Sequence, residues 1–285
     1  MILAGCGRIG FDPSSATSDG AAGTSDGSGP VGPFGDFGTP VAQTALYSPE
    51  VDYGPCLSSD GLELYFTSER PPTLGYGDLW RATRLDRSSE FSNLEVLPAL
   101  SSNTGDGECT LSNDGLTLYI QRDQRFYTTT RSDPSSAAWS GVVEIPMDGN
   151  LYGYFGMDVG ANDMRLVIGD FNSRLYEARP DASAWGVPSD LGIGGMFNDS
   201  YPSLRADGLE IFWQSQRSGT LATIWHATRP ALDQPFTGVE RIPLGPLDLA
   251  DVGDPDISAD GRTLTIVSNI ADVNYNVYIV DRVPL

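Results

Sequence analysis

The chain has 285 residues, with 17 basic and 38 acidic side chains and a formal net charge of −21. A chain this acidic excludes nucleic-acid binding, because phosphate contacts need a basic surface, and it disfavours docking on anionic lipid. Every basic residue is Arg, which excludes Lys Schiff bases, a Lys general base and the Walker phosphate loop. The single His, His226, rules out a cluster of His metal ligands. The 33 Gly and 20 Pro indicate many turns and few long helices.

Residues 1–10 contain Leu3-Ala4-Gly5-Cys6, which resembles the lipobox of bacterial lipoproteins, where the Cys is acylated. We expect this segment to be the remnant of a signal peptide, with Cys6 as the lipidation site. The expected location is the bacterial cell envelope, as an outer-membrane lipoprotein or in the periplasm. No run of 18 apolar residues occurs, so the membrane would be reached only through the lipid anchor.

Residues 11–35 are rich in Ser, Gly, Asp, Thr, Ala and Pro. Such a composition buries too little apolar surface to offset the entropy lost on ordering. The sequence therefore predicts a flexible linker between the anchor and a folded domain over residues 36–285.

A repeating unit fills the rest of the chain. An Asp-Gly turn recurs at Asp60-Gly61, Asp114-Gly115, Asp207-Gly208 and Asp260-Gly261, and the third unit has Asn162-Asp163 in its place. A short apolar run such as Leu64-Tyr65-Phe66 follows each turn. Asp-Gly between such runs predicts a hairpin, because Gly adopts the positive φ of a tight turn.

Later in each unit an aromatic residue, an Arg and a second aromatic residue recur in fixed order. The first aromatics are Trp80, Tyr127, Tyr176, Trp225 and Tyr278; the Arg residues are Arg84, Arg131, Arg179, Arg229 and Arg282; the second aromatics are Phe91, Trp139, Trp185 and Phe236. We expect these rings to pack between neighbouring units.

Five units of four strands each predict an all-β, five-bladed β-propeller with antiparallel blades. The fifth unit ends before a fourth strand could form, whereas residues 37–46 have the fourth-strand pattern and precede the first unit. This N-terminal strand is expected to complete the last blade and close the ring.

The repeat resembles the WD40-like propeller repeat family found in TolB and other bacterial envelope proteins. The resemblance rests on Leu-Ser-x-Asp-Gly-x-x-Leu-Tyr-Phe at residues 57–66 and Asp-Leu-Trp-x-Ala-Thr-Arg at residues 78–84, and it covers residues 36–285. It implies a propeller like the C-terminal half of TolB and a role as a binding platform. It supplies no catalytic residue.

Cys56, Cys109 and His226 are candidates for special chemistry outside the repeat pattern. Cys56 and Cys109 lie on successive units but one position out of register, which predicts opposite side-chain directions and two buried thiols rather than a disulfide. His226 follows Trp225, and strand alternation predicts a surface imidazole if that Trp packs inward.

Several acidic residues precede the first strand of their blades. Asp52, Asp106 and Asp199 occupy equivalent positions, with Asp254 and Asp251 nearby in the last blade and Glu108 in the second. First strands of a propeller line its central channel, so these carboxylates are expected at the channel mouth. They would either cap turns and bond to the backbone, or bind a cation or a basic ligand. Ca²⁺ is the candidate cation, with Asp52, Asp106, Asp199 and Asp254 as its ligands, and an Arg- or Lys-rich peptide of a partner is the alternative.

The favoured function is a non-enzymatic binding or scaffold protein, monomeric, that recognises an envelope protein or a small ligand on one face of the propeller. The alternatives are a glycoside hydrolase with two carboxylates at the channel and a carbohydrate-binding propeller. A hydrolase requires a deep pocket with a carboxyl pair, which the structure can test.

Overall fold

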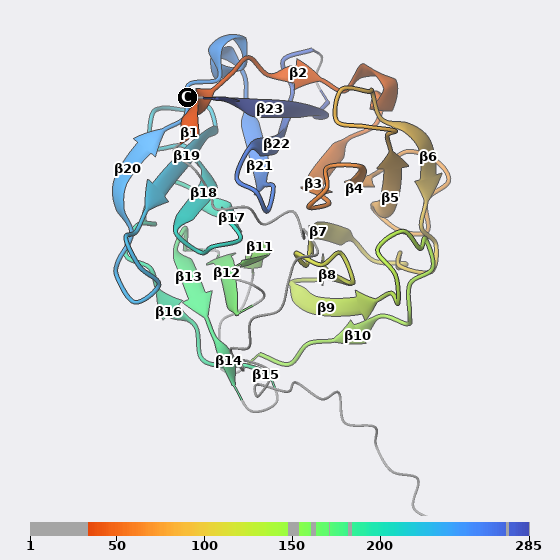
Figure 1. The fold of residues 1–285 in the computed structure, drawn as a ribbon, viewed down its shortest axis with the longest axis horizontal. Coiled ribbons are helices and arrows are strands. Elements are labelled where there is room, and N and C mark those ends of the chain that lie inside the picture. The colour runs from red at the N-terminus through yellow and green to blue at the C-terminus, as the bar shows by residue number, and fades with distance from the viewer. Residues whose placement is uncertain are drawn as a thin grey trace, which may run out of the picture.

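The structure is a computed structural model that describes residues 34–147, 154–160, 164–170, 172–181, 184–271 and 274–284. Cys6 and nearly all of the expected linker lie outside these ranges, as does the Asn162-Asp163 turn. Within them the chain forms five small antiparallel sheets arranged in a ring (Figure 1). The predicted five-bladed propeller is confirmed. No helix in the described residues is long and apolar enough to cross a membrane.

Each blade runs outward from the central channel in chain order. Blade 1 comprises β3 (Asp52–Leu57), β4 (Glu63–Ser68), β5 (Asp78–Thr83) and β6 (Ser92–Val96). Blade 2 comprises β7 (Asp106–Leu111), β8 (Thr117–Arg122), β9 (Arg125–Thr130) and β10 (Val143–Glu144). Blade 3 comprises β11 (Tyr154–Gly160), β12 (Arg165–Asp170), β13 (Leu175–Ala178) and β16 (Ser189–Asp190), with a small hairpin of β14 (Pro180–Asp181) and β15 (Ala184–Trp185). Blade 4 comprises β17 (Ser200–Leu204), β18 (Glu210–Ser215), β19 (Thr223–Thr228) and β20 (Thr237–Arg241).

The fifth blade combines both ends of the chain. Its inner strands are β21 (Val252–Ile257), β22 (Thr263–Ser268) and β23 (Asn276–Pro284). Its outer edge is formed by β1 (Phe34–Phe37) and β2 (Val41–Ala42), which both pair with β23. The predicted closure by an N-terminal strand is confirmed, although residues 44–46 form the 3₁₀ turn η1 and the first strand begins at Phe34. A second 3₁₀ turn, η2 (Gly245–Leu249), precedes β21.

The repeated Arg residues explain why each unit keeps its motif. The guanidinium groups of Arg84, Arg131 and Arg229 donate to the carbonyl oxygens of Gly61, Gly115 and Gly208 at 2.6–2.7 Å, which fixes the Asp-Gly turns. The same groups stack on Phe91, Trp139 and Phe236, with 4.3–4.6 Å from Cζ to the ring centroid. In blade 5, Arg282 stacks on Phe37 at 4.6 Å, so Phe37 takes the place of the fourth-strand aromatic.

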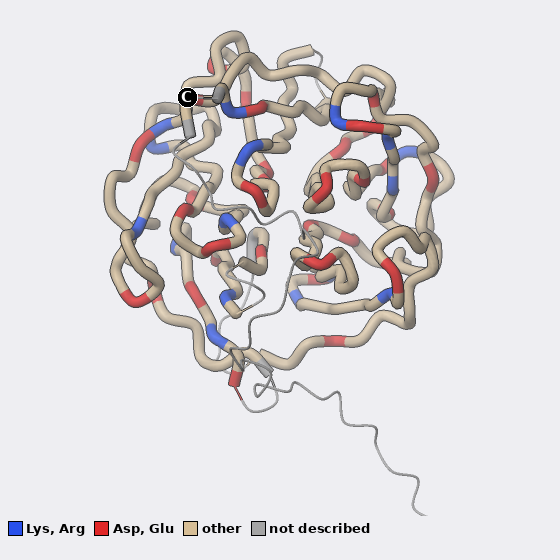
Figure 2. Tube along the Cα trace, in the orientation of Figure 1, with Lys and Arg blue, Asp and Glu red and all other residues tan. Residues whose placement is uncertain are grey.

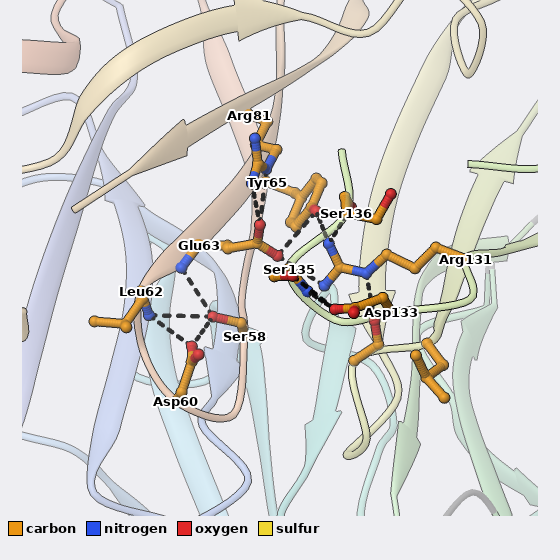
Figure 3. Close-up of polar contacts among 12 residues, drawn as sticks. Ser58, Asp60, Leu62, Glu63, Tyr65, Arg81, Arg131, Asp133, Ser135 and Ser136 are labelled. Atoms are coloured by element: carbon orange, nitrogen blue, oxygen red, sulfur yellow. Dashed lines mark hydrogen bonds and ion pairs between the residues drawn. The ribbon is translucent and has the colours of Figure 1, made fainter. Parts of the chain in front are cut away.

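These Arg side chains also join blades. Arg131 of blade 2 pairs with Glu63 of blade 1 at 2.7 Å, and Glu63 is contacted by Arg81 and the hydroxyl of Tyr65 as well (Figure 3). Equivalent ion pairs join Arg229 to Glu177 and Arg282 to Glu210, both at 2.6 Å. Because these pairs are buried, losing the Glu of a pair would leave its Arg as an uncompensated charge.

Contacts between the innermost strands join all five blades around the channel; we call these contacts the inner ring. Cys56 of blade 1 is disulfide-bonded to Cys109 of blade 2, with 5.9 Å between their Cα atoms. Thr110 of blade 2 donates to Asp158 of blade 3, and Asp158 accepts from Ser203 of blade 4 at 2.8 Å. Two bonds to backbone amides complete the ring: Ile257 N donates to Ser203 Oγ at 2.9 Å, and Leu57 N donates to Asp256 Oδ2 at 3.0 Å.

The disulfide corrects the prediction of two separate thiols. That prediction was wrong because it treated one face of each blade as common to all blades. In a ring, neighbouring blades contact each other through opposite faces. Two side chains that meet between blades must therefore point in opposite directions from their own sheets. An offset of one position between Cys56 and Cys109 supplies these opposite directions.

We expect reduction of this disulfide to destabilise the fold. It closes a loop of 53 residues, and a loop of this size corresponds to about 2–4 kcal/mol of stabilisation, mainly through the unfolded chain. Thermal unfolding of the Cys56→Ser/Cys109→Ser variant should therefore show a melting temperature lower by roughly 5–15 °C. Reductant should lower the melting temperature of the wild type and leave the variant unchanged. Equal melting temperatures with and without reductant in the wild type would contradict the disulfide.

Ring closure can be tested by two truncations. Deletion of residues 1–33 should leave a folded protein, because β1 and β2 remain. Deletion of residues 1–47 removes both strands, the Arg282–Phe37 stack and the buried Leu46. Loss of two large apolar side chains and an edge ladder should lower the melting temperature by on the order of 10 °C or cause aggregation. Indistinguishable melting curves for the two truncations would refute the closing role of this segment.

Candidate functional site

The two faces of the propeller are built from different connections. The Asp-Gly turns and the connections between third and fourth strands lie on one face, called here the turn face. The connections between second and third strands, and those between blades, lie on the other, called here the loop face. The first strand of each blade begins at the loop face, so the acidic residues singled out in the sequence belong to it.

Three of the predicted cation ligands are held apart, each in its own blade. Asp52 pairs with Arg70 at 2.7 Å, Asp106 with Arg122 at 2.6 Å and Asp199 with Arg217 at 2.7 Å. Each Arg also donates to a backbone carbonyl, that of Leu46, Leu100 or Ile193 respectively. These buried pairs fasten the second strand of a blade to the start of its first strand.

The fourth predicted ligand, Asp254, is placed differently. It lies two residues inside β21 and accepts a hydrogen bond from Gly54 N across the junction of blades 5 and 1, at 3.1 Å. The structure therefore does not bring the four residues together. The described residues contain no group of three or more His, Cys, Asp or Glu side chains arranged to hold a metal ion. Ca²⁺ binding therefore remains a prediction, and the four predicted ligands do not form one common site.

A bulge in the first strand of every blade shapes the channel mouth. The strand register shifts in all five blades, at Tyr53/Cys56 in the first and at equivalent points in the others. The residues at the bulge position are Gly54, Glu108, Gly156, Tyr201 and Asp254. Four of them have positive φ, and for Tyr201 (51°) and Asp254 (49°) this conformation is strained.

The two glycines make room for the side chains beside them. A Cβ on Gly54 would lie 2.9 Å from Glu108 Oε2, and a Cβ on Gly156 would lie 2.3 Å from the Cα of Tyr201. Glu108 of blade 2 and Asp254 of blade 5 thus both contact Gly54, one on each side of blade 1. The mouth is lined by a carboxyl pair and by the partly exposed rings of Tyr53 and Tyr201.

The pKa values of these channel carboxyls are raised because the groups are buried. Burial in the channel, together with the nearby charges of Asp254 and Asp256, raises the pKa of Glu108 well above its usual range. Burial raises the pKa of Asp254 to about 6, although the hydrogen bond from Gly54 N opposes the shift. Deeper in the channel, burial and the charge of Asp158 raise the pKa of Asp256 well above its usual range. Sequence reasoning named Glu108 and Asp254 but could not pair them.

Two small cavities lie along the channel below the mouth. One, of about 10 Å³, is lined by residues that include Glu108, Tyr201 and Asp256, and the other, of about 20 Å³, lies between Asp158, Asp256 and the turn-face loops. Each has room for about one water molecule. Sites for small organic ligands typically measure roughly 300–1,000 Å³. Neither cavity can hold a sugar ring.

His226 is not the surface imidazole that strand alternation predicted. Its ring stacks on Phe212, with 5.9 Å between centroids and 21° between planes, and its Nδ1 lies 3.0 Å from Glu210 Oε1. Glu210 also pairs with Arg205 and Arg282. The prediction failed because both faces of a blade are covered by neighbouring blades, so a side chain that turns away from one blade interface enters the next. His226 belongs to the contact between blades 4 and 5.

Just over half of the exposed large apolar side chains lie on the loop face. Of the thirteen large apolar side chains exposed in the described residues, seven lie in its loops: Leu74, Tyr76, Met196, Phe197, Leu221, Leu249 and Ile270. The others lie on outer strands or on the turn face. A concentration of this kind on one face of an acidic protein is typical of an interaction surface.

Comparisons with known proteins identify the fold. No family model and no curated protein matches the chain. Among solved structures, the catalytic domain of a GH62 α-L-arabinofuranosidase from Coprinopsis cinerea is similar at 12% sequence identity and a TM-score of 0.60, over 87% of this chain and 96% of that one. An α-L-arabinofuranosidase from Podospora anserina in complex with cellotriose is similar at 10% sequence identity and a TM-score of 0.61, over 88% of this chain and 97% of that one. TolB from Acinetobacter baumannii is similar at 15% sequence identity and a TM-score of 0.53, over 83% of this chain and 56% of that one. At these identities the likeness shows the propeller fold alone.

The channel carboxyls predict an unusual pH dependence of stability. Because the pKa values of Glu108, Asp254 and Asp256 are raised in the folded state, their ionisation destabilises the fold above those pKa values, and protonation relieves this as the pH falls. The melting temperature should rise between pH 8 and about pH 5, by several degrees, since a shift of one unit corresponds to about 1.4 kcal/mol.

The Glu108→Gln variant provides the check. It should melt higher than the wild type at pH 8 and show a smaller rise on acidification, because one buried charge has been removed. Glu90→Gln, at an exposed position just before β6, is the control and should follow the wild type. A wild-type melting temperature that falls steadily from pH 8 to pH 5 would show that the channel carboxyls are not the controlling groups.

Proposed function

We propose that this protein is a non-enzymatic binding or scaffold protein of the bacterial cell envelope that recognises a partner through the loop face of its propeller. The observation that carries this proposal is the concentration of exposed apolar side chains on the loop face, above a channel whose cavities hold only single waters. The propeller supplies a rigid frame, and the loops on that frame are free to differ from blade to blade.

The glycoside hydrolase alternative has weaker support. Hydrolysis by two carboxylates requires both beside a cleft that holds the sugar, with separations of about 5–9.5 Å. The carboxylates deep in the channel are engaged in structure: Asp158 accepts from Ser203 and Leu204, and Asp256 accepts from Leu57. Glu108 and Asp254 remain, and the cavity beside Glu108 has a volume of about 10 Å³. The α-L-arabinofuranosidase neighbours share the fold and carry this alternative only by analogy.

The cell-envelope location is part of the proposal. The Cys56–Cys109 disulfide supports it, because structural disulfides persist in oxidising compartments such as the periplasm. Acylation at Cys6 would provide the anchor, and incorporation of labelled palmitate that is lost in Cys6→Ser would support that step.

Two multiple variants test whether partner binding depends on the loop face. A loop-face variant carries Leu74→Ser, Tyr76→Ser, Met196→Ser and Leu249→Ser, and a turn-face control carries Leu85→Ser, Met164→Ser and Val187→Ser. All seven side chains are exposed, so both variants should fold with stabilities within about 0.5 kcal/mol of the wild type per substitution. Quantitative capture from envelope extract should recover a specific partner with the wild type and the turn-face control and lose it with the loop-face variant.

Two results would overturn this proposal. Release of reducing sugar from arabinan, xylan or an aryl arabinofuranoside, abolished by Glu108→Gln and by Asp254→Asn, would establish a hydrolase and overturn the proposal. Equal capture by the loop-face variant and the wild type would also overturn it.

A further inference from the structure

The exposed apolar residues of the loop face are not spread evenly. Five of them lie on connected loops of blades 4 and 5, and we call this group the apolar arc: Met196, Phe197, Leu221, Leu249 and Ile270. Met196 and Leu249 are 93% and 82% exposed. Leu74 and Tyr76 lie apart from the arc, on the loop between β4 and β5 of blade 1.

Backbone hydrogen bonds hold the arc together as one surface. Gln216 N donates to Phe197 O at 2.8 Å, and the side chain of Gln216 donates to Thr220 O, directly before Leu221. The next residue, Ala222, donates its N–H to Asp251 Oδ1 at 2.8 Å, and Asn269, directly before Ile270, exchanges hydrogen bonds with the backbone of Asp251. Three loops that are far apart in the sequence therefore meet at Asp251.

The charges around the arc are unbalanced. The Arg residues nearest to it are already paired: Arg217 with Asp199 at 2.7 Å, beneath Phe197, and Arg241 with Asp248 at 3.2 Å. Asp251 has no ion pair in the described residues, and Asp254 lies three residues further along, at the channel mouth. Figure 2 shows acidic positions on the chain around the centre of the ring. Loops of the apolar arc thus meet at a carboxylate that forms no ion pair with an Arg in the described residues.

We propose that the apolar arc is the docking site for a protein segment that carries both apolar and basic side chains. Apolar side chains of the partner would cover Met196 and Leu249, and an Arg or Lys beside them would pair with Asp251. The charge of −21 on the whole chain would attract such a segment and speed its association at low salt. This inference rests on the proposed binding function and assigns it a place and a partner chemistry.

The test uses a synthetic peptide of alternating Leu and Arg, labelled with fluorescein, and the protein lacking residues 1–33. Fluorescence anisotropy should show saturable binding that weakens with salt. Matched peptides with Glu in place of Arg, or Ser in place of Leu, should bind at least ten-fold more weakly. Because a few central apolar contacts dominate most interfaces, Met196→Ser/Leu249→Ser should weaken binding by about ten-fold or more. Asp251→Asn keeps the oxygen that accepts from Ala222, and it should reduce the salt dependence.

The control is Leu74→Ser/Tyr76→Ser, which removes two exposed apolar residues from the same face but outside the arc. It should bind the Leu-Arg peptide as the wild type does. Three outcomes would overturn the inference: equal peptide binding by the arc variant, a wild-type dimer in sedimentation velocity that the arc variant converts to a monomer, or flotation with phosphatidylcholine vesicles that requires the arc. If envelope-extract capture depends on Leu74 and Tyr76 but not on the arc, the inference fails while the binding function stands.

Discussion

The inner ring is the constraint on which the rest of this structure depends. A propeller blade is a sheet of four strands whose two faces are both apolar, and it is stable only when another blade covers each face. The chain must therefore close, and it does so at five junctions of the first strands with a disulfide, a shared carboxylate and side chain-to-backbone hydrogen bonds. These contacts are short polar or covalent links.

The same closure accounts for the charged groups at the centre. Asp158 and Asp256 serve the ring by accepting backbone and hydroxyl hydrogen bonds, and their burial raises the pKa of each. Glu108 and Asp254 lie at the bulges of the first strands of their blades and both contact Gly54 at the mouth. The outer Asp–Arg pairs hold the strand starts in register. The acidic residues of the channel are thus mostly explained by architecture.

A five-bladed propeller is shared by hydrolases and binding proteins, so the fold does not decide between them. Two cavities of the channel have room for about one water molecule each, and the loop face exposes apolar side chains on loops that contact Asp251, which has no ion pair in the described residues. These observations are the support for the binding function proposed above.

The sequence by itself determined the five blades, the Asp-Gly turns, the repeated Arg beside an aromatic ring and the closing N-terminal strand. These features depend on local turn chemistry and strand periodicity, which act within one unit and recur in all of them. Only the tertiary structure decided what each repeated side chain faces. Strand alternation predicted two thiols and a surface imidazole. Instead Cys56 is bonded to Cys109 of the next blade, and His226 stacks on Phe212 of its own blade on the face that blade 5 covers, because neighbouring blades cover both faces of every sheet. Likewise, equivalent positions suggested that Asp52, Asp106 and Asp199 would converge, whereas each is bound to an Arg at the end of its own second strand, since pairing within a blade is set by register and not by position around the ring.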